Sequence, residues 1–176
     1  MIERRAGLFE DSRFRDPTTG DERAMLAGFL RSQRETLVVK CSGLTDALAT
    51  RAVPPSTLSL LGLVRHLADM ERRWFRRVLA GQDAPALFSS AADPDGDFDG
   101  ATADPAVIAE AWTAWRAEVD FAEEFTAATA MDHTGHDGWR GEVSLRWVLV
   151  HMVEEYARHN GHADLLRERI DGALGL

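Results

Sequence analysis

The sequence predicts an all-α protein, a four-helix bundle, on three observations. Four segments repeat apolar residues every three to four positions, which is the period of one helix face. Helix-capping Ser, Thr or Asp residues precede the second and third segments, and glycine or proline interrupts the chain between segments. No segment shows the alternating pattern that indicates a strand. The 176 residues are expected to form one domain, 1–176, large enough to enclose a core.

The first two helices are predicted on either side of a connector that contains Pro54 and Pro55. The first helix spans about residues 21–40, and a short helical turn is expected within 45–51. Either Ser56 or Thr57 is expected to cap the second helix. That helix should end at residue 80, because Gly81 can adopt the left-handed conformation that stops a helix.

The other two helices are predicted after loops rich in Asp, Gly, Ser and Pro. Residues 81–103 form the first loop, and Asp104 and Pro105 then open a helix that reaches about residue 128. Residues 131–142 form the second loop, and the fourth helix is expected over 143–170.

The fourth helix carries ionisable residues where its apolar stripe should continue. Glu155, His159 and His162 follow Leu145, Val148 and Met152 at helical spacing and precede Leu166 on the same face. A carboxylate and imidazoles that face a core cost several kcal/mol unless something compensates them. A bound metal ion is the simplest compensation, and side chains four residues apart can converge on one ion.

His66, on the apolar face of the second helix, is the expected third metal ligand beside Glu155 and His159. Two histidines and one glutamate leave a coordination position free, which is typical of catalytic metal sites. His162 and His151 are alternative ligands or residues that support a ligand from behind. A buried polar network without metal, with Glu155 paired to an arginine, is the competing interpretation.

The other polar motifs give weaker indications of a functional site. The acidic loop 93–100 is expected to be a solvated turn, because the final ligand position of an EF-hand would fall on Ala106. His133 and His136 are expected to be exposed loop residues. Arg140 and Arg146 could hold a carboxylate, although surface arginines are common in this chain.

Composition limits the function classes. The net charge of −9 argues against nucleic acid and anionic membranes as partners. No apolar run is long enough to span a bilayer, and the start of the chain lacks the apolar segment of a signal peptide. The single cysteine, Cys41, fits a reducing cytoplasm and is expected to pack rather than react. We therefore expect a cytoplasmic protein.

Two segments carry a family resemblance, P-P-S-T-L-S-L-L-G-L-V-R-H-L and H-M-V-E-E-Y-A-R-H-N-G-H-A-D-L-L-R-E. They resemble the DinB/YfiT-like superfamily, in particular an uncharacterised branch common in actinobacteria. The resemblance implies a four-helix bundle that holds a divalent metal through three side chains, usually histidines, and that often forms a homodimer. His66 and His159 match family histidines. Glu155 replaces a third, as in the N-terminal domain of the similar mycothiol-dependent maleylpyruvate isomerase.

The resemblance implies a metal-dependent enzyme, since some relatives use a small thiol such as mycothiol as cosubstrate. The leading hypothesis is a thiol-dependent S-transferase or isomerase that acts on a small-molecule electrophile. Zinc is the first expectation for the metal, with nickel, iron and manganese as alternatives. A hydrolase is the other enzymatic interpretation. A non-catalytic metal-binding protein of the stress response is the alternative outside enzymes.

Overall fold

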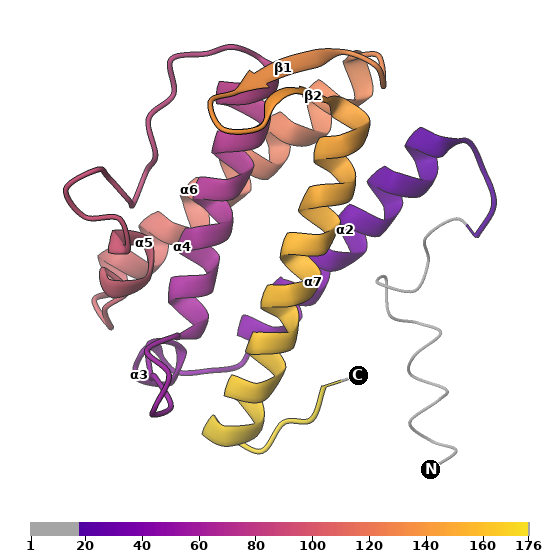
Figure 1. The fold of residues 1–176 in the computed structure, drawn as a ribbon. Coiled ribbons are helices and arrows are strands. Elements are labelled where there is room, and N and C mark those ends of the chain that lie inside the picture. The colour runs from indigo at the N-terminus through magenta and orange to yellow at the C-terminus, as the bar shows by residue number, and fades with distance from the viewer. Residues whose placement is uncertain (1–17, 176) are drawn as a thin grey trace.

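The computed structural model describes residues 18–175, and these are mostly helical, which confirms the all-α prediction (Figure 1). The long helical segments are α2 (Glu22–Cys41), α4 (Leu60–Glu71), α6 (Pro105–Ala128) and α7 (Leu145–Ile170), and α4 continues directly into the π-helical η2 (Arg72–Leu79). The short elements are α3 (Asp46–Ala49), α5 (Gly96–Asp99) and the strands β1 (Thr134–Asp137) and β2 (Gly141–Ser144).

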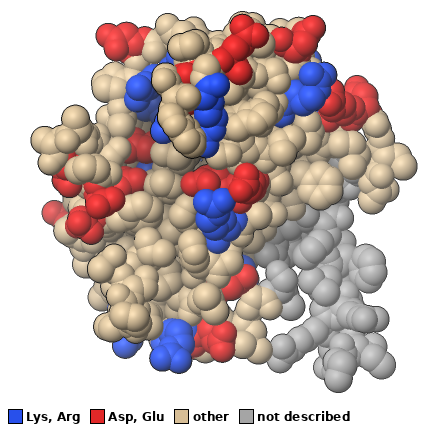
Figure 2. All heavy atoms as spheres, in the orientation of Figure 1, with Lys and Arg blue, Asp and Glu red and all other residues tan. Residues whose placement is uncertain are grey.

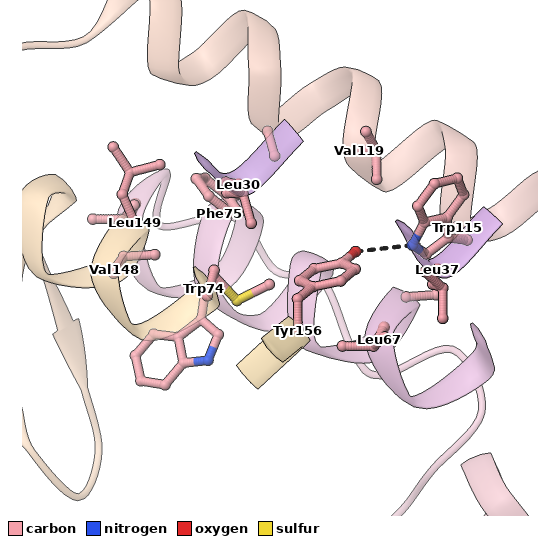
Figure 3. Packing of buried hydrophobic residues seen from close by; sticks show 14 of the residues in the cluster. Leu30, Leu37, Leu67, Trp74, Phe75, Trp115, Val119, Val148, Leu149 and Tyr156 are labelled. Atoms are coloured by element: carbon pink, nitrogen blue, oxygen red, sulfur yellow. Dashed lines mark hydrogen bonds between the residues drawn. The ribbon is translucent and has the colours of Figure 1, made fainter. Parts of the chain in front are cut away.

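The long helices pack in pairs around a shared core. α2 lies against α7, α4 lies against α6, and α4 also contacts α7, beside which it runs in Figure 1. Buried side chains from every long helix meet in one cluster, part of which is drawn in Figure 3. Its largest fully buried members include Trp74, Phe75 and Tyr156. The contact between α4 and α7 brings together the two helices that carry the predicted metal ligands.

Side-chain caps fix most of the predicted helix starts. The carboxylate of Asp21 accepts a hydrogen bond from the amide of Ala24 at 2.8 Å, and Asp104 caps α6 in the same manner. The predicted start of α4 was two or three residues too early, because Ser59 is its cap rather than Ser56 or Thr57. The hydroxyl of Ser56 instead accepts from the amide of Leu58 in a local turn.

The predicted second loop, 131–142, is wrong in part, because β1 and β2 form an antiparallel hairpin there. The hairpin packs on η2 through Gly135, where a Cβ atom would overlap the carbonyl oxygen of Val78. Only glycine allows this approach. Because β2 takes up Val143 and Ser144, α7 begins at Leu145, two residues later than predicted.

The surface shows no single block of charge on the face drawn in Figure 2, where basic side chains are separated by acidic and uncharged ones. Acidic side chains gather over the region of α5, which belongs to an aspartate-rich segment. Among the described residues, no helix has both the length and the apolarity needed to cross a bilayer.

Candidate metal centre

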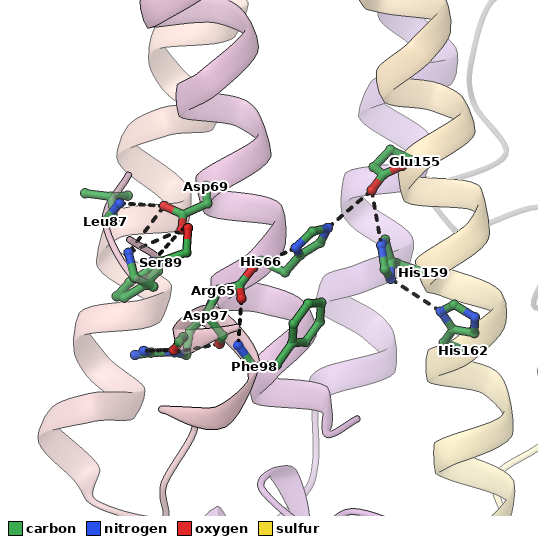
Figure 4. A network of polar contacts seen from close by, with 12 residues as sticks. Arg65, His66, Asp69, Leu87, Ser89, Asp97, Phe98, Glu155, His159 and His162 are labelled. Atoms are coloured by element: carbon green, nitrogen blue, oxygen red, sulfur yellow. Dashed lines mark hydrogen bonds and ion pairs between the residues drawn. The ribbon is translucent and has the colours of Figure 1, made fainter. Parts of the chain in front are cut away.

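Three of the residues singled out in the sequence come together between α4 and α7. His66 lies in α4, and Glu155 and His159 lie one turn apart in α7. One potential ligand atom from each side chain lies within 4.8 Å of the other two. Figure 4 shows His66 pointing across the gap between the helices toward Glu155, with His159 below that carboxylate.

The distances within this cluster suit a metal ion. The Oε1 atom of Glu155 lies 3.2 Å from the Nε2 atom of His66 and 3.3 Å from the Nε2 atom of His159. Ligand atoms about 2.1 Å from a tetrahedral ion are roughly 3.4 Å apart. Two of the three ligand-to-ligand distances are therefore close to this spacing, and the two nitrogens and one oxygen suit zinc and similar cations.

The cluster is neither sealed in the core nor freely solvated. The side chains of His66, Glu155 and His159 are 15%, 12% and 9% exposed. Arg158 reaches Glu155 only at 3.8 Å, between Nη1 and Oε2, and makes its shorter contact, 2.8 Å, with Glu154. The arginine pairing considered for Glu155 is thus a peripheral contact, and the imidazoles are its closer partners.

Each histidine of the cluster is held from behind by its other ring nitrogen. The Nδ1 atom of His66 lies 2.8 Å from Oδ2 of Asp97, and the Nδ1 atom of His159 lies 3.4 Å from Nδ1 of His162. Both rings therefore present Nε2 to the centre of the cluster. A carboxylate behind a histidine fixes the tautomer and orientation that metal binding requires.

Asp97 reaches His66 because the segment before α6 folds back on α4. The guanidinium of Arg65 donates to the backbone carbonyls of Gly96 and Asp97, each at 2.9 Å. Phe98 stacks on the His66 ring with the centroids 4.7 Å apart. The expectation that this acidic loop is solvated is therefore wrong at Gly96 and Asp97, which are both buried.

A second contact holds the same segment to α4. The carboxylate of Asp69 accepts hydrogen bonds from the amides of Leu87 and Ser89 at 2.6 and 3.0 Å, and from the Ser89 hydroxyl at 2.9 Å. Successive turns of α4 thus position the metal-site histidine and secure the loop that supports it, as Figure 4 shows.

Opposite charges inside the cluster shift the pKa values of its members. Hydrogen bonds from His159 and His66 hold the pKa of Glu155 well below its usual range. Burial alone would lower the pKa of His66, but its hydrogen bonds to Asp97 and Glu155 outweigh burial and raise the pKa to about 9. A cation bound at Nε2 takes the place of that proton, so metal binding at such a group becomes tighter as pH rises.

The other imidazoles on the α7 face lie outside the three-residue cluster. His162 contacts His159 from the side away from Glu155, as the arrangement in Figure 4 shows. The ring of His151 stacks on Trp147 with the centroids 4.9 Å apart, and it meets Trp74 edge-on. His162 therefore contacts a proposed ligand, whereas His151 packs against tryptophan rings.

The remaining candidate residues have other surroundings. Arg146 pairs with Glu22, whereas the guanidinium of Arg140 lies over the ring of Trp139. His133 contacts the backbone carbonyl of Leu79 at 2.9 Å, and His136 is exposed on the hairpin. Burial raises the pKa of the Cys41 thiol to about 12, so this side chain stays protonated and unreactive near neutral pH.

Comparisons with known proteins point to one family. A family model described as mycothiol-S-transferase matches residues 25–172, a range that includes His66, Asp97, Glu155, His159 and His162. A comparison with curated proteins gave no match.

Proposed function

Because the chain belongs to the mycothiol-S-transferase family, we propose that it joins mycothiol, through its thiol sulfur, to an electrophile with the help of a divalent cation. His66, Glu155 and His159 would hold the cation. The observation that supports this proposal is the convergence of two Nε2 atoms on one carboxylate oxygen at 3.2 and 3.3 Å. Asp97 and His162, which contact the far sides of the same rings, add to it.

Zinc is the first candidate for the cation, with nickel, iron and manganese as alternatives, because imidazole and carboxylate ligands accept all four. A bound cation of this kind acts as a Lewis acid that lowers the pKa of a thiol and so favours the nucleophilic thiolate. Cys41, the one cysteine among the described residues, does not compete as the nucleophile, because burial raises the pKa of its thiol and keeps it protonated.

The residues of the chain have separate parts in this reaction. Asp97 keeps the His66 ring in one orientation. His162 lies beside the cluster and can accept the proton that the thiol loses, and His151 is the second imidazole on this face of α7. The S–H bond breaks, a C–S bond forms, and the leaving group departs with its electron pair. This balance needs no oxidant or reductant.

Metal content is the first test. Elemental mass spectrometry of the purified, tag-free protein should find about one equivalent of a divalent metal per chain, and His66→Ala, Glu155→Ala and His159→Ala should each lose it because three ligands leave little redundancy. His136→Ala, a change of an exposed histidine on the hairpin, is the matched control and should retain the metal. Equal loss in the control, or no metal after reloading the native protein, would overturn the metal site.

Turnover is the second test. The metal-loaded protein should conjugate mycothiol to a chromogenic aryl halide, and the Glu155→Ala variant should not. Mycothiol should also raise the melting temperature of the loaded native protein, since a ligand that binds only the folded state stabilises it. Stoichiometric metal with neither conjugation nor a thiol-dependent shift would contradict the transferase and favour the non-catalytic metal-binding protein.

A further inference from the structure

A pocket of about 300 Å³ lies on the C-terminal side of the metal cluster. Val53 and Leu58, from the segment before α4, form one part of its wall, and Leu165 and Leu166 of α7 form another. His162, Arg169 and Ser56 line the pocket as well. The pocket is therefore largely apolar, with an imidazole and a guanidinium as its ionisable groups.

The pocket adjoins the metal cluster through His162. Its Nδ1 atom lies 3.4 Å from Nδ1 of His159, and the two rings meet edge-on with centroids 5.3 Å apart. One imidazole thus separates the pocket from a proposed metal ligand. A molecule in the pocket would have its near end against His162, which contacts a proposed ligand directly.

Packed apolar side chains also connect the pocket wall to His66. Val53, Leu58 and Leu166 belong to the smaller of the two apolar clusters, and the same cluster contains Phe98. Phe98 stacks on the His66 ring. Apolar side chains therefore pack together from the pocket wall to the ring of His66.

Leu165 is the exposed part of this wall. Its side chain is 63% exposed on α7, although an apolar residue of this size gains by burial. The preceding turn of the same helix carries His162, so Leu165 stands at the mouth of the pocket. A ligand that enters the pocket would cover the Leu165 side chain and remove part of its apolar surface from water.

From this geometry we propose that the pocket binds the apolar body of the electrophilic substrate. Its reacting carbon would lie toward His162 and the metal cluster. The inference rests on the proposed transferase function and adds the substrate class, which is an electrophile with an aromatic or branched aliphatic group. Small polar electrophiles gain nothing from this pocket, so the pocket acts on selectivity among electrophiles and leaves thiol activation unchanged.

Steady-state kinetics with two electrophiles test the proposal. 4-Nitrobenzyl chloride carries an aromatic ring, and iodoacetamide does not. Leu165→Ala should raise KM for 4-nitrobenzyl chloride by on the order of fivefold, from the methylene groups removed from the pocket wall. The kcat value and the kinetics with iodoacetamide should stay unchanged. Val150→Ala, which truncates another exposed apolar residue of α7 away from the pocket, is the matched control.

A binding measurement separates failure of the pocket from failure of the transferase. The unreactive 4-nitrobenzyl alcohol should bind the full chain, and ligand-observed NMR should show weaker binding to Leu165→Ala but unchanged binding to Val150→Ala. Binding with this pattern but no turnover would support the pocket and overturn the transferase. Equal effects of the two variants, or no effect of Leu165→Ala on either readout, would overturn the pocket.

Discussion

Asp97 is the side chain on which the orientation of His66 depends, since their 2.8 Å contact holds the ring from behind. Asp97→Ala should weaken metal affinity about 10- to 100-fold, the usual loss when such a supporting carboxylate is removed. Asp97→Asn, which can still accept a hydrogen bond but carries no charge, should fall between the native protein and the alanine variant. Competition with a chelating indicator measures all of these affinities.

Asp99→Ala is the control for this prediction, because Asp99 is exposed in the same short helix, α5. It should bind metal like the native protein. A similar loss in the Asp97 and Asp99 variants would mean that negative charge near the site, rather than the contact with His66, supports the metal.

The residues of the cluster could be found from the sequence, whereas Asp97 could not. Glu155 and His159 are one turn apart on an apolar face, and His66 interrupts another such face, so helical periodicity alone singles them out. Asp97 meets His66 across 31 residues of chain. Neighbouring aspartates alternate along the same loop, and no local signal distinguishes the one that the folded loop directs inward.

His162 shows a related limit. Its spacing from His159 places it on the same face of α7, which the sequence predicts correctly, but a position on a face does not tell a ligand from a supporting residue. The choice depends on which way the ring turns, and here Nδ1 of His162 faces Nδ1 of His159. Side-chain direction of this kind is fixed by packing after the helices meet.

At the level of elements, the hairpin of β1 and β2 is held to η2 by Asp137. One oxygen of this buried carboxylate accepts from the guanidinium of Arg73 at 2.9 Å, and the other accepts from the amide of Arg140 at 2.9 Å. Burial alone would raise the pKa of Asp137, but these bonds outweigh burial and lower the pKa to about 2. The ionised form is therefore favoured by folding.

This lowered pKa gives a pH-dependent stability. The contribution of Asp137 is complete above the pKa of the unfolded chain, about 4, and is lost as pH falls toward the folded value of about 2. Asp137→Asn should cost about 1–3 kcal/mol of unfolding free energy near neutral pH. The difference between the native protein and the variant should shrink between pH 5 and pH 2. Urea unfolding at several pH values measures it, and a constant difference would contradict the assignment.

The hairpin itself was not predictable from local pattern. Its strands have only four residues each, T-G-H-D and G-E-V-S, and glycine, aspartate and glutamate are poor strand formers. The pairing exists because Gly135 lets β1 approach η2 closely and Asp137 binds Arg73 across that contact. By contrast, the caps at Asp21 and Asp104 depend on residues within one turn, so the starts of α2 and α6 were predicted correctly.

At the level of the whole molecule, a chain of buried polar contacts joins the four long helices. Arg34 of α2 donates to both carboxylate oxygens of Glu71 in α4, at 2.8 and 2.7 Å. Tyr156 of α7 donates to the same carboxylate at 2.8 Å, and Trp115 of α6 donates to the Tyr156 hydroxyl at 2.9 Å (Figure 3). These contacts tie helices that the sequence predicts separately but whose mutual arrangement it does not specify.

The network bears on the metal cluster because it spans the same pair of helices. Tyr156 directly follows Glu155 in α7, and Glu71 ends the helix that carries His66. Burial alone would lower the pKa of Arg34, but the charge and hydrogen bonds of Glu71 outweigh burial and raise the pKa of this guanidinium, which stays charged. This buried ion pair joins α2 to α4, the Tyr156 hydrogen bond links the same carboxylate to α7, and such a pair is costly to break on one side.

Glu71→Ala should therefore destabilise the protein by about 3–5 kcal/mol, because the buried Arg34 would keep only its longer contact of 3.4 Å with Glu123. Tyr156→Phe should cost only about 1–2 kcal/mol, since the ion pair survives the loss of one hydroxyl. The double variant Arg34→Met with Glu71→Met should recover most of the loss, because apolar side chains of similar size need no charged partner. Urea unfolding of the three variants measures these differences, and a double variant no more stable than Glu71→Ala would show that the charges and hydrogen bonds of the pair, rather than the space it fills, stabilise the fold. Recovery of both stability and metal affinity in the double variant would mean that the space of Arg34 and Glu71 must be filled to bring His66 and Glu155 together. An ion pair and a pair of apolar side chains would then serve equally well.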